Sequence, residues 1–344
     1  VFVQYALGAS RMAIAHGGLA PMDEERSPRA GVIIGSGIGG LPMIEATYDR
    51  LKEKGPSRIN PFFIPGVIVN MAAGLVSIEY NLKGPNSATC TACSTGTHAI
   101  GEAFRLIRDG RADMMIAGGT DSVICALGVG GFAAMRALST RNDDPAAASR
   151  PFDSGRDGFV CGEGAGVLVL EALEHAQARG AQPLAELVGY GATADASHIT
   201  LPAPGGIGAV RAARRALEKA GLTPADIAHV NAHATSTPEG DKAELQAIRT
   251  VFGEDAGKVA VTANKSMIGH TLGAAGAIEA IATIMAIRDG VVPPTINLHD
   301  PDPNADGLDL TPNVAQRRDI AAALSNSFGF GGQNTALVFT RWDG

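Results

Sequence analysis

The sequence predicts a layered α/β fold made of two similar halves. Short apolar runs of strand character alternate with helical patterns along the 344 residues, which is typical of α/β layering. The chain holds 44 glycines but only 5% aromatic residues, so we expect tight turns and packing through small side chains. A small-residue helix ending in Ile107-Arg108-Asp109-Gly110 is echoed by one ending in Ile287-Arg288-Asp289-Gly290, which indicates an internal repeat.

The expected elements follow in chain order from their periodicity. Buried strands are predicted at residues 32–34, 114–117, 167–170, 184–188, 230–232, 259–262, 321–324 and 335–339. Helices are predicted at residues 99–107, 207–220, 238–251 and 272–287. The loop at residues 179–183 contains glycine and proline and is the expected hinge, so the predicted halves are residues 1–180 and 181–344.

Composition and charge narrow the functional class. The formal net charge of −7 argues against a nucleic-acid-binding surface, although it is compatible with a local basic patch for an acidic partner. No run reaches the roughly 18 to 20 apolar residues that span a bilayer, and no export signal is visible. Four cysteines in a chain of this length do not form a disulfide framework, so we expect a cytoplasmic location.

Cys93 is the leading candidate for a nucleophile. It lies where a strand-like run turns into a helical one, and we expect it on the first turn of that helix. A cysteine in this position faces backbone N–H groups and the positive end of the helix dipole, and both favour the thiolate. Cys90, Cys125 and Cys161 lack this setting and are expected to be structural. Cys90 and Cys93 have the spacing of half a zinc site, but no second pair follows, so no metal is expected.

His233 stands at a second strand-to-loop junction. An apolar strand ends at this histidine, and Thr237-Pro238 opens the next helix with proline at its first position. Residues at strand ends in layered α/β folds face the crevice where ligands bind, so His233 is a candidate functional residue. The hydroxyl groups of Thr235 and Thr237 are predicted to lie beside it.

Two further junctions repeat this arrangement. His270 follows another strand and precedes a helix rich in glycine and alanine, and the nearby Lys265 could hold a carboxylate or tune an imidazole. The fourth junction runs from Ser325 to Gly332 and contains Phe330 between glycines. Those glycines would let backbone N–H groups approach a reacting oxygen and let the ring swing.

A glycine motif invites a different interpretation, which the surrounding sequence argues against. Gly35-Ser36-Gly37-Ile38-Gly39-Gly40 fits the dinucleotide fingerprint G-x-G-x-x-G after a strand. The helical stretch after it ends at Gly55-Pro56, and no second strand with an acidic residue follows where the ribose contact should be. We therefore expect no dinucleotide cofactor.

Together, these segments resemble the β-ketoacyl-acyl carrier protein synthases of the elongating Cys-His-His type, most closely synthase II. The resemblance rests on the Cys93 segment, Thr235-Ser236-Thr237-Pro238 after His233, Lys265-Ser266-Met267-Ile268-Gly269-His270, and Asn326-Ser327-Phe328-Gly329-Phe330-Gly331-Gly332. Gly118-Gly119-Thr120-Asp121, Phe152-Asp153 and Gly162-Glu163-Gly164-Ala165-Gly166 also fit, so the resemblance covers essentially the whole chain. It implies a thiolase-like fold, with two pseudo-repeated halves in a layered α/β/α/β/α core, and a homodimer.

The resemblance also implies an acyltransferase of fatty-acid biosynthesis. Cys93 would receive the growing acyl chain from acyl carrier protein as a thioester. Malonyl-acyl carrier protein would lose CO2, and its enolate carbon would attack that thioester, while His233 and His270 would donate hydrogen bonds to the developing enolate oxygen. No cofactor is implied beyond the phosphopantetheine arm of the carrier protein.

The remaining implied roles concern support and substrate binding. Lys265 would support the histidines together with Glu279. Backbone N–H groups of Cys93 and Phe330 would form an oxyanion hole, and Phe330 would gate the site. Substrate contacts are implied for Thr235 and Thr237 with the phosphopantetheine arm, Ile38 and Phe132 with the acyl chain, and Arg58 and Arg136 with the carrier protein.

Departures from the family pattern leave alternatives open. Ala234 stands where glycine is common and Gln333 where threonine is common, but neither change removes a reacting group. The chain starts at Val1 as if inside a helix, so by resemblance an opening strand and helix of the first half would be absent. A ketosynthase of polyketide or specialised lipid synthesis would use the same residues. A non-catalytic partner subunit of the same fold would lack Cys93, and a degradative thiolase would need a second reactive cysteine.

Overall fold

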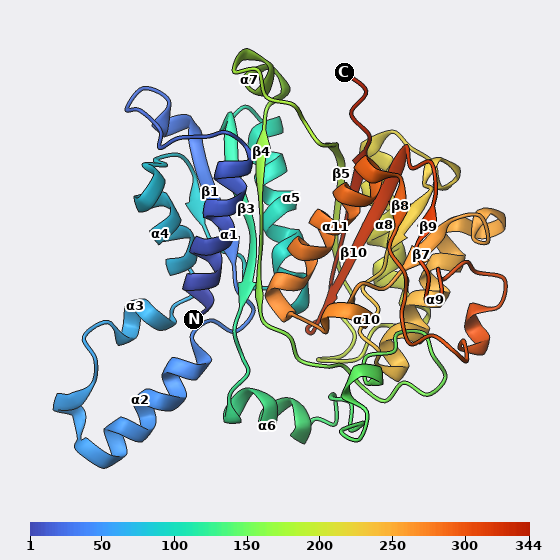
Figure 1. Cartoon of the computed structure of the whole chain (residues 1–344), viewed down its shortest axis with the longest axis horizontal. Coiled ribbons are helices and arrows are strands. Elements are labelled where there is room, and N and C mark those ends of the chain that lie inside the picture. The colour runs from blue at the N-terminus through green and yellow to red at the C-terminus, as the bar shows by residue number, and fades with distance from the viewer. The chain divides into compact units, whose positions relative to one another are not determined.

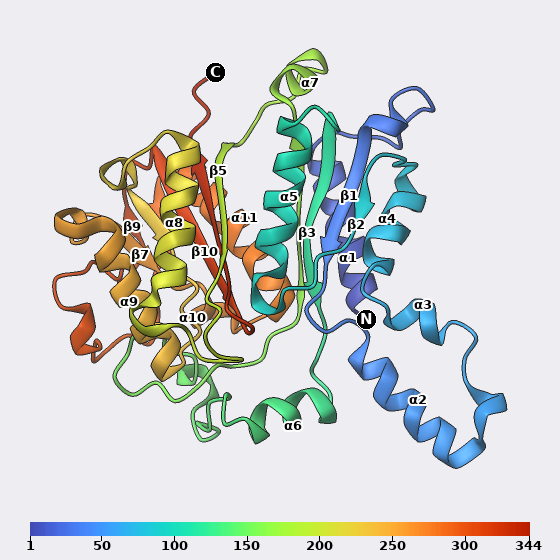
Figure 2. The ribbon, with the colours of Figure 1, turned by 180° about the vertical axis from the view of Figure 1, so that it is seen from behind.

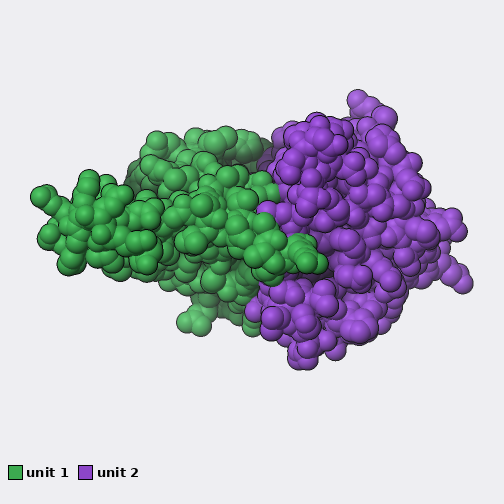
Figure 3. All heavy atoms as spheres, turned by 90° about the horizontal axis from the view of Figure 1, so that it is seen from below, with its two compact units in different colours: residues 1–136, 161–182, 271–277 green, residues 137–160, 183–270, 278–344 purple.

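The computed structural model describes residues 1–344, and the chain folds into two compact units. Unit 1 comprises residues 1–136, 161–182 and 271–277, and unit 2 comprises residues 137–160, 183–270 and 278–344 (Figure 3). The chain therefore passes between the units several times, once between residues 182 and 183, within the predicted hinge at residues 179–183. The boundary predicted there between two sequential halves stays a prediction.

Unit 1 is built on a four-stranded sheet in the order β2-β1-β3-β4. The strands are β1 (Ala30–Gly35), β2 (Asn86–Ser87), β3 (Met114–Asp121) and β4 (Gly164–Glu171), and only the β3–β4 pair is antiparallel. Helices α1 (Phe2–His16) and α4 (Met71–Tyr80) cover one face of this sheet, and α5 (Thr95–Arg108) covers the other (Figures 1 and 2). The core between α1, α4 and the sheet contains Phe2, Val32 and Ile116, all buried.

Unit 1 contains four further helices. They are α2 (Leu41–Lys54), α3 (Phe63–Val67), α6 (Ala126–Ala134) and α7 (Leu173–Ala178). Helix α2 packs against α3 and α6 but has no fully buried residue. Its apolar side chains, such as Ile44 and Tyr48, are exposed to solvent.

Unit 2 is built on a five-stranded sheet in the order β5-β11-β10-β6-β7. The strands are β5 (Glu186–Ala194), β6 (His229–Asn231), β7 (Ala260–Thr262), β10 (Ala322–Gly329) and β11 (Gln333–Thr340). Strands β10, β6 and β7 run parallel, whereas β11 is antiparallel to both neighbours. Helix α8 (Ile207–Ala220) packs on β5 and β11, and α9 (Pro238–Phe252) packs against α8 (Figure 2). Buried Val210, Leu245 and Leu324 lie in this core.

The remaining elements are short, apart from one helix. The helix α11 (Ala275–Asp289) begins in unit 1 and continues in unit 2. Unit 2 also contains α10 (Lys265–Ile268) and the strand pair β8 (Val291–Val292) and β9 (Gln316–Arg317). Turns of 3₁₀-helix are η1 (Ser27–Arg29), η2 (Pro56–Arg58), η3 (Ala92–Ser94), η4 (Pro145–Ala147), η5 (Pro204–Gly206), η6 (Pro224–Asp226), η7 (Gly253–Asp255), η8 (Leu272–Ala274) and η9 (Pro303–Ala305). No helix is both long enough and apolar enough to cross a membrane.

The predicted α/β class and most of the predicted elements are confirmed. The expected strands correspond to β1, β3, β4, β5, β6, β7, β10 and β11, although β5 begins at Glu186 and extends further than predicted. The helix expected at residues 272–287 is instead a 3₁₀ turn, η8, followed by α11. Likewise, Cys93 lies in η3, directly before α5, and not on the first turn of the α-helix itself. The reason is the backbone: Ala92 and Leu272 have φ of 49° and 51°, which an α-helix does not accept.

Candidate active site

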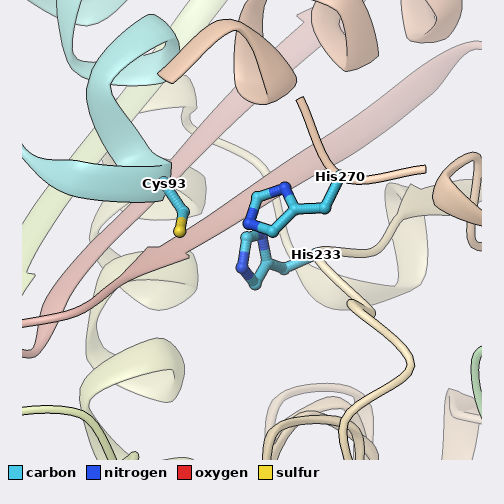
Figure 4. A group of neighbouring side chains, drawn as sticks. All are labelled: Cys93, His233 and His270. Carbon is cyan, nitrogen blue, oxygen red and sulfur yellow. The ribbon is translucent and has the colours of Figure 1, made fainter. Parts of the chain in front are cut away.

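Cys93 occupies the middle of a turn that is fixed by its neighbours' side chains. The Thr95 hydroxyl accepts a hydrogen bond from the backbone N–H of Thr91 at 2.9 Å and donates one to the carbonyl of Ala92 at 2.7 Å. These bonds span the turn, so Cys93 is held just before the amino-terminal end of α5 with only 8% of its surface exposed (Figure 4). The positive end of the α5 dipole favours a thiolate at this place.

The other cysteines differ in their electrostatic surroundings. Burial raises the pKa of the Cys90 and Cys125 thiols, and it raises the pKa of Cys161 to about 11. The nearby carboxylates of Asp121, Glu45 and Glu163, respectively, raise these pKa values further. All three thiols are therefore protonated near neutral pH, which supports Cys93 as the nucleophile.

His233 follows β6, and a carboxylate on α9 fixes its backbone. The N–H groups of His233 and Ala234 donate to the two oxygens of Glu244 at 2.8 Å and 2.7 Å. One helical turn earlier, Asp241 accepts the N–H groups of Ser236 at 3.1 Å and Phe152 at 2.9 Å. The first turns of α9 thus hold the loop that carries His233.

Lys265 determines which ring nitrogen of His233 carries the proton. Its Nζ donates to the His233 carbonyl at 2.6 Å and lies 3.5 Å from Nδ1 of the same residue. An ammonium group can only donate, so Nδ1 is the acceptor and the proton of the neutral ring resides on Nε2. Nε2–H is the atom that His233 can offer to a substrate oxygen.

The charge of Lys265 is balanced by Glu279 of α11. Both side chains are almost completely buried, and Nζ forms a short ion pair with Oε1 of Glu279. Burial raises the pKa of Glu279, whereas Lys265 acts in the opposite direction. The carbonyl of Glu279 and the hydroxyl of Thr283 accept bonds from Asn231 of β6 at 3.0 Å and 3.1 Å, which ties this part of α11 to the strand that leads to His233.

His270 faces His233 edge to face. The ring centroids lie 5.4 Å apart with an interplanar angle of 86° (Figure 4). The His270 backbone N–H donates to Val160 at 2.7 Å, and its ring also meets the Phe159 ring at 5.4 Å. Burial, reinforced by the positive charge of Lys265, holds the pKa of both histidines well below its usual range. Both rings are therefore neutral at physiological pH, and each carries one N–H that can donate a hydrogen bond.

The other predicted residues of unit 2 lie on loops near the carboxyl ends of strands. Thr235 and Thr237 are partly exposed, and their hydroxyls bond each other at 3.0 Å. Phe330 lies in the turn between β10 and β11, where Gly331 and Gly332 have φ of 85° and 74°. The ring of Phe328, at the end of β10, packs against His233 at 5.6 Å between centroids.

The predicted acyl-pocket residues belong to unit 1. Ile38 lies in the loop after β1, and Phe132 is a half-buried residue of α6. In the same unit, Arg58 ends η2 and Arg136 follows α6, both with exposed side chains. The N–H groups of Gly37 and Ile38 in the glycine motif donate to the Asp121 carboxylate at 3.0 Å and 3.2 Å. A bound phosphate would need these same N–H groups. The motif therefore binds the carboxylate of Asp121 in place of a dinucleotide phosphate.

Sequence reasoning missed the buried acids of α9. Burial raises the pKa of Glu244 to about 7 and that of Asp241 to about 6, and Arg156 lies 3.6 Å from Asp241 and 2.7 Å from Asp302. Acidic residues in the first turns of a helix are common for dipole reasons alone. The sequence therefore carried no sign that they hold the loop that carries His233.

Comparison with known families agrees with these features. Residues 1–176 match the beta-ketoacyl synthase N-terminal domain, and residues 184–299 match the beta-ketoacyl synthase C-terminal domain. The chain is 54% identical to the 3-oxoacyl-[acyl-carrier-protein] synthase 2 of Rhizobium meliloti, over 100% of the chain and 81% of that protein. It is also 54% identical to the enzyme of the same name from Coxiella burnetii, over 99% of the chain and 82% of that protein.

Solved structures show the same fold. A ketosynthase structure described as a type II polyketide synthase acyl-carrier protein in complex with its ketosynthase matches with a TM-score of 0.96, 37% identity, and coverage of 99% and 85% of the two chains. A beta-ketoacyl synthase from Burkholderia phymatum matches with a TM-score of 0.93, 40% identity, and coverage of 99% and 82%. The predicted thiolase-like fold and the predicted acyltransferase class are thereby confirmed. The chain belongs to the β-ketoacyl synthase family.

Proposed function

We propose that this enzyme condenses malonyl-acyl carrier protein with an acyl chain held on Cys93, and so elongates fatty acids by two carbons. The observation that carries the proposal is the buried, uncharged pair His233 and His270, with Lys265 fixing the proton of His233 on Nε2. Neutral donors in a buried site stabilise an oxyanion that forms only during reaction. The 54% identity to enzymes named 3-oxoacyl-[acyl-carrier-protein] synthase 2 supports this substrate class.

Chain connectivity supports the joint action of Cys93 and His270. Within unit 1, η3, which holds Cys93, packs against η8. The turn η8 begins two residues after His270, so the chain leads from this histidine straight into the packing around Cys93. A histidine tethered in this way can act on a group bound to the cysteine.

The first half-reaction would load the enzyme. The Cys93 thiolate attacks the thioester carbonyl of acyl-acyl carrier protein, and the phosphopantetheine sulfur leaves as a thiolate that takes a proton from solvent. The amino-terminal end of α5 stabilises the thiolate, so no histidine is needed as its base. Cys93 then carries the acyl chain as a thioester.

The second half-reaction would form the new carbon–carbon bond. Malonyl-acyl carrier protein loses CO2, and the electrons of the broken bond move onto its thioester oxygen, where Nε2–H of His233 and the His270 ring donate hydrogen bonds. The enolate carbon attacks the Cys93 thioester, and backbone N–H groups of Cys93 and Phe330 bind the oxyanion. Collapse releases 3-oxoacyl-acyl carrier protein and regenerates the Cys93 thiolate.

Substrate contacts complete the proposal. Thr235 and Thr237 bind the phosphopantetheine arm, Ile38 and Phe132 line the acyl pocket, Phe330 gates it, and Glu279 supports Lys265. Arg58 and Arg136 are exposed and can meet an acidic carrier protein. We propose no metal and no cofactor other than the carrier-borne arm.

We further propose that the enzyme is a cytoplasmic homodimer. Large apolar side chains of the α2–α3 region and of α6 are exposed, among them Tyr48, Phe62, Ile64 and Leu127. Such a concentration of exposed apolar side chains supports an interface with a second copy. None of the four cysteines forms a disulfide, which fits a reducing compartment.

Intact-protein mass spectrometry after incubation with acyl-carrier proteins tests the loading step. We expect the wild type to gain the acyl mass and Cys93→Ala to gain none, with Cys125→Ala as the matched control that is still acylated. His233→Ala should retain acylation but lose most malonyl decarboxylation. Acylation of Cys93→Ala at the wild-type level would refute the proposed nucleophile. Acyl carrier proteins of the polyketide and fatty-acid types, compared side by side, separate the two pathways that the family serves.

A further inference from the structure

Asp121 is a buried carboxylate that binds two separate chain segments. It ends β3 and is fully buried, yet it forms no ion pair. Its Oδ1 accepts the Ser36 hydroxyl at 2.7 Å and the Ile38 N–H at 3.2 Å. Its Oδ2 accepts the N–H groups of Gly37 at 3.0 Å and Gly273 at 2.6 Å. Four neutral donors thus surround one buried charge.

The packing around Asp121 leaves no room for side chains. A Cβ on Gly37 or Gly273 would lie 2.8 Å or 2.6 Å from Oδ2 of Asp121, closer than real Cβ contacts. Ser36 extends the network, because its hydroxyl oxygen accepts the N–H of Gly39 at 2.9 Å. The backbone of both segments is therefore drawn tightly onto the carboxylate.

The two segments that Asp121 joins flank the reacting groups. The Ser36–Ile38 loop carries Ile38, and a Cβ on Gly37 would lie 3.4 Å from the carbonyl of Ala92, in the turn that holds Cys93. Gly273 is the middle residue of η8, three residues after His270. Burial raises the pKa of Asp121, and the four donors oppose this shift. Losing one donor therefore leaves the buried carboxylate less well stabilised.

We infer that Asp121 is a positioning residue that sets acyl-chain selectivity by fixing the Ser36–Ile38 loop against η8. The inference rests on the proposed function, in which Ile38 lines the acyl pocket. On this proposal, a long acyl chain reaches the wall that this loop forms, whereas a short chain does not. Loosening the loop should therefore slow the loading of long chains more than that of short chains.

Asp121→Asn gives the sharpest test. If the amide oxygen of the asparagine keeps the bonds from Gly37 and Gly273, its NH2 group faces the Ile38 N–H. Two donors cannot bond each other, so the Ile38 bond is lost while the side-chain volume is unchanged. We expect the ratio of long-chain to short-chain acylation rates at Cys93, measured by intact mass, to fall about tenfold. Ser36→Ala removes a different bond of the same network and should lower the ratio in the same direction.

Thr120→Val is the matched control. Thr120 neighbours Asp121 on β3, points to the opposite face, and donates a buried hydrogen bond to the Phe2 carbonyl at 2.7 Å. This variant should lower the melting temperature but leave the ratio unchanged, because partial unfolding slows all chain lengths equally. A ratio within twofold of the wild type in folded Asp121→Asn and Ser36→Ala would overturn the inference. A wild-type enzyme that is not acylated at all would instead refute the proposed function.

Discussion

The turn that holds Cys93 and the turn after His270 have the same backbone design. In both, a threonine precedes a 3₁₀ turn whose first residue has positive φ, 49° at Ala92 and 51° at Leu272. Each turn leads directly into a helix, α5 or α11. An Ile-Arg-Asp sequence lies at the end of both helices, although Asp109 directly follows α5 whereas Asp289 is the last residue of α11. In each case a glycine comes next, with φ of 69° at Gly110 and 62° at Gly290.

The side chains carried by the two turns differ. The middle residue of the first turn is Cys93, whereas Gly273 takes that place in the second, and its N–H donates to Asp121. The fifth helical residue is Ala99 in α5 but Glu279 in α11, where it pairs with Lys265. One backbone design therefore presents the proposed nucleophile, Cys93, in one copy and supports the neutral His233 in the other. The repeated backbone fixes the geometry of the two turns, and the residues that differ between them determine the chemistry of each.

The largest effect is expected from Lys265→Met, which leaves Glu279 buried without its counter-charge. Removing one partner of a buried ion pair typically costs about 3–5 kcal/mol of unfolding free energy, because the remaining group must be neutralised in the folded state. Because a raised folded-state pKa favours the protonated form, the loss should shrink as pH falls towards 5 and grow as pH rises through 7. Urea unfolding at pH 5, 7 and 8 measures this dependence.

The double variant Lys265→Met with Glu279→Ala gives α11 an alanine at its fifth residue, as α5 has in Ala99. We expect it to recover much of the stability at pH 7, because no buried charge remains without a partner. Malonyl decarboxylation should stay low, since the donor to the His233 carbonyl is gone. Full activity of the double variant would show that Lys265 serves stability alone.

A smaller effect is expected from Gly273→Ala. A Cβ there would lie 2.6 Å from Asp121 and 2.5 Å from the Gly37 nitrogen, so we expect overpacking to cost about 1–3 kcal/mol of unfolding free energy. The equivalent change in the other turn, Cys93→Ala, removes one buried atom and should cost about 1 kcal/mol or less. Equal costs in urea unfolding would contradict the difference between the two turns.

The sequence predicted the strand ends that carry the site residues, but not the turns and hydrogen bonds that shape these strand ends. Cys93, His233 and His270 could be singled out, because a polar or reactive residue after an apolar strand is a local pattern, and Phe330 could be singled out by the glycines that flank it. The 3₁₀ turns could not, because Ala92 and Leu272 are residue types that rarely adopt positive φ. Long-range bonds to Glu244 and Asp121 were also hidden, since only the fold brings these acids to the loops they hold.

The pH dependence of stability should also differ between the two helices. The fourth residue of α5 is His98, whose Nδ1 lies 2.9 Å from the Thr91 hydroxyl, whereas α11 has Ile278 there. Burial lowers the pKa of His98, so its neutral form contributes stability above pH 6.5 that is lost as pH falls. His98→Ile should therefore gain melting temperature relative to the wild type between pH 8 and pH 5. A constant difference across this range would exclude His98 as a source of acid sensitivity.

The smallest effect is expected from Ala92→Gly, which tests the shared positive φ itself. A left-handed backbone costs a residue with a Cβ about 1–2 kcal/mol, and glycine removes this strain but adds about 0.5–1 kcal/mol of unfolded-state entropy. The two nearly cancel, so we expect the free energy of unfolding to change by no more than about 1 kcal/mol. Ala99→Gly, in the interior of α5, has no such strain to relieve and should lose about 1 kcal/mol. If both glycine variants lost the same stability in urea unfolding, the left-handed conformation at Ala92 would not be a source of strain, and the turn would be held by the Thr95 bonds without opposition.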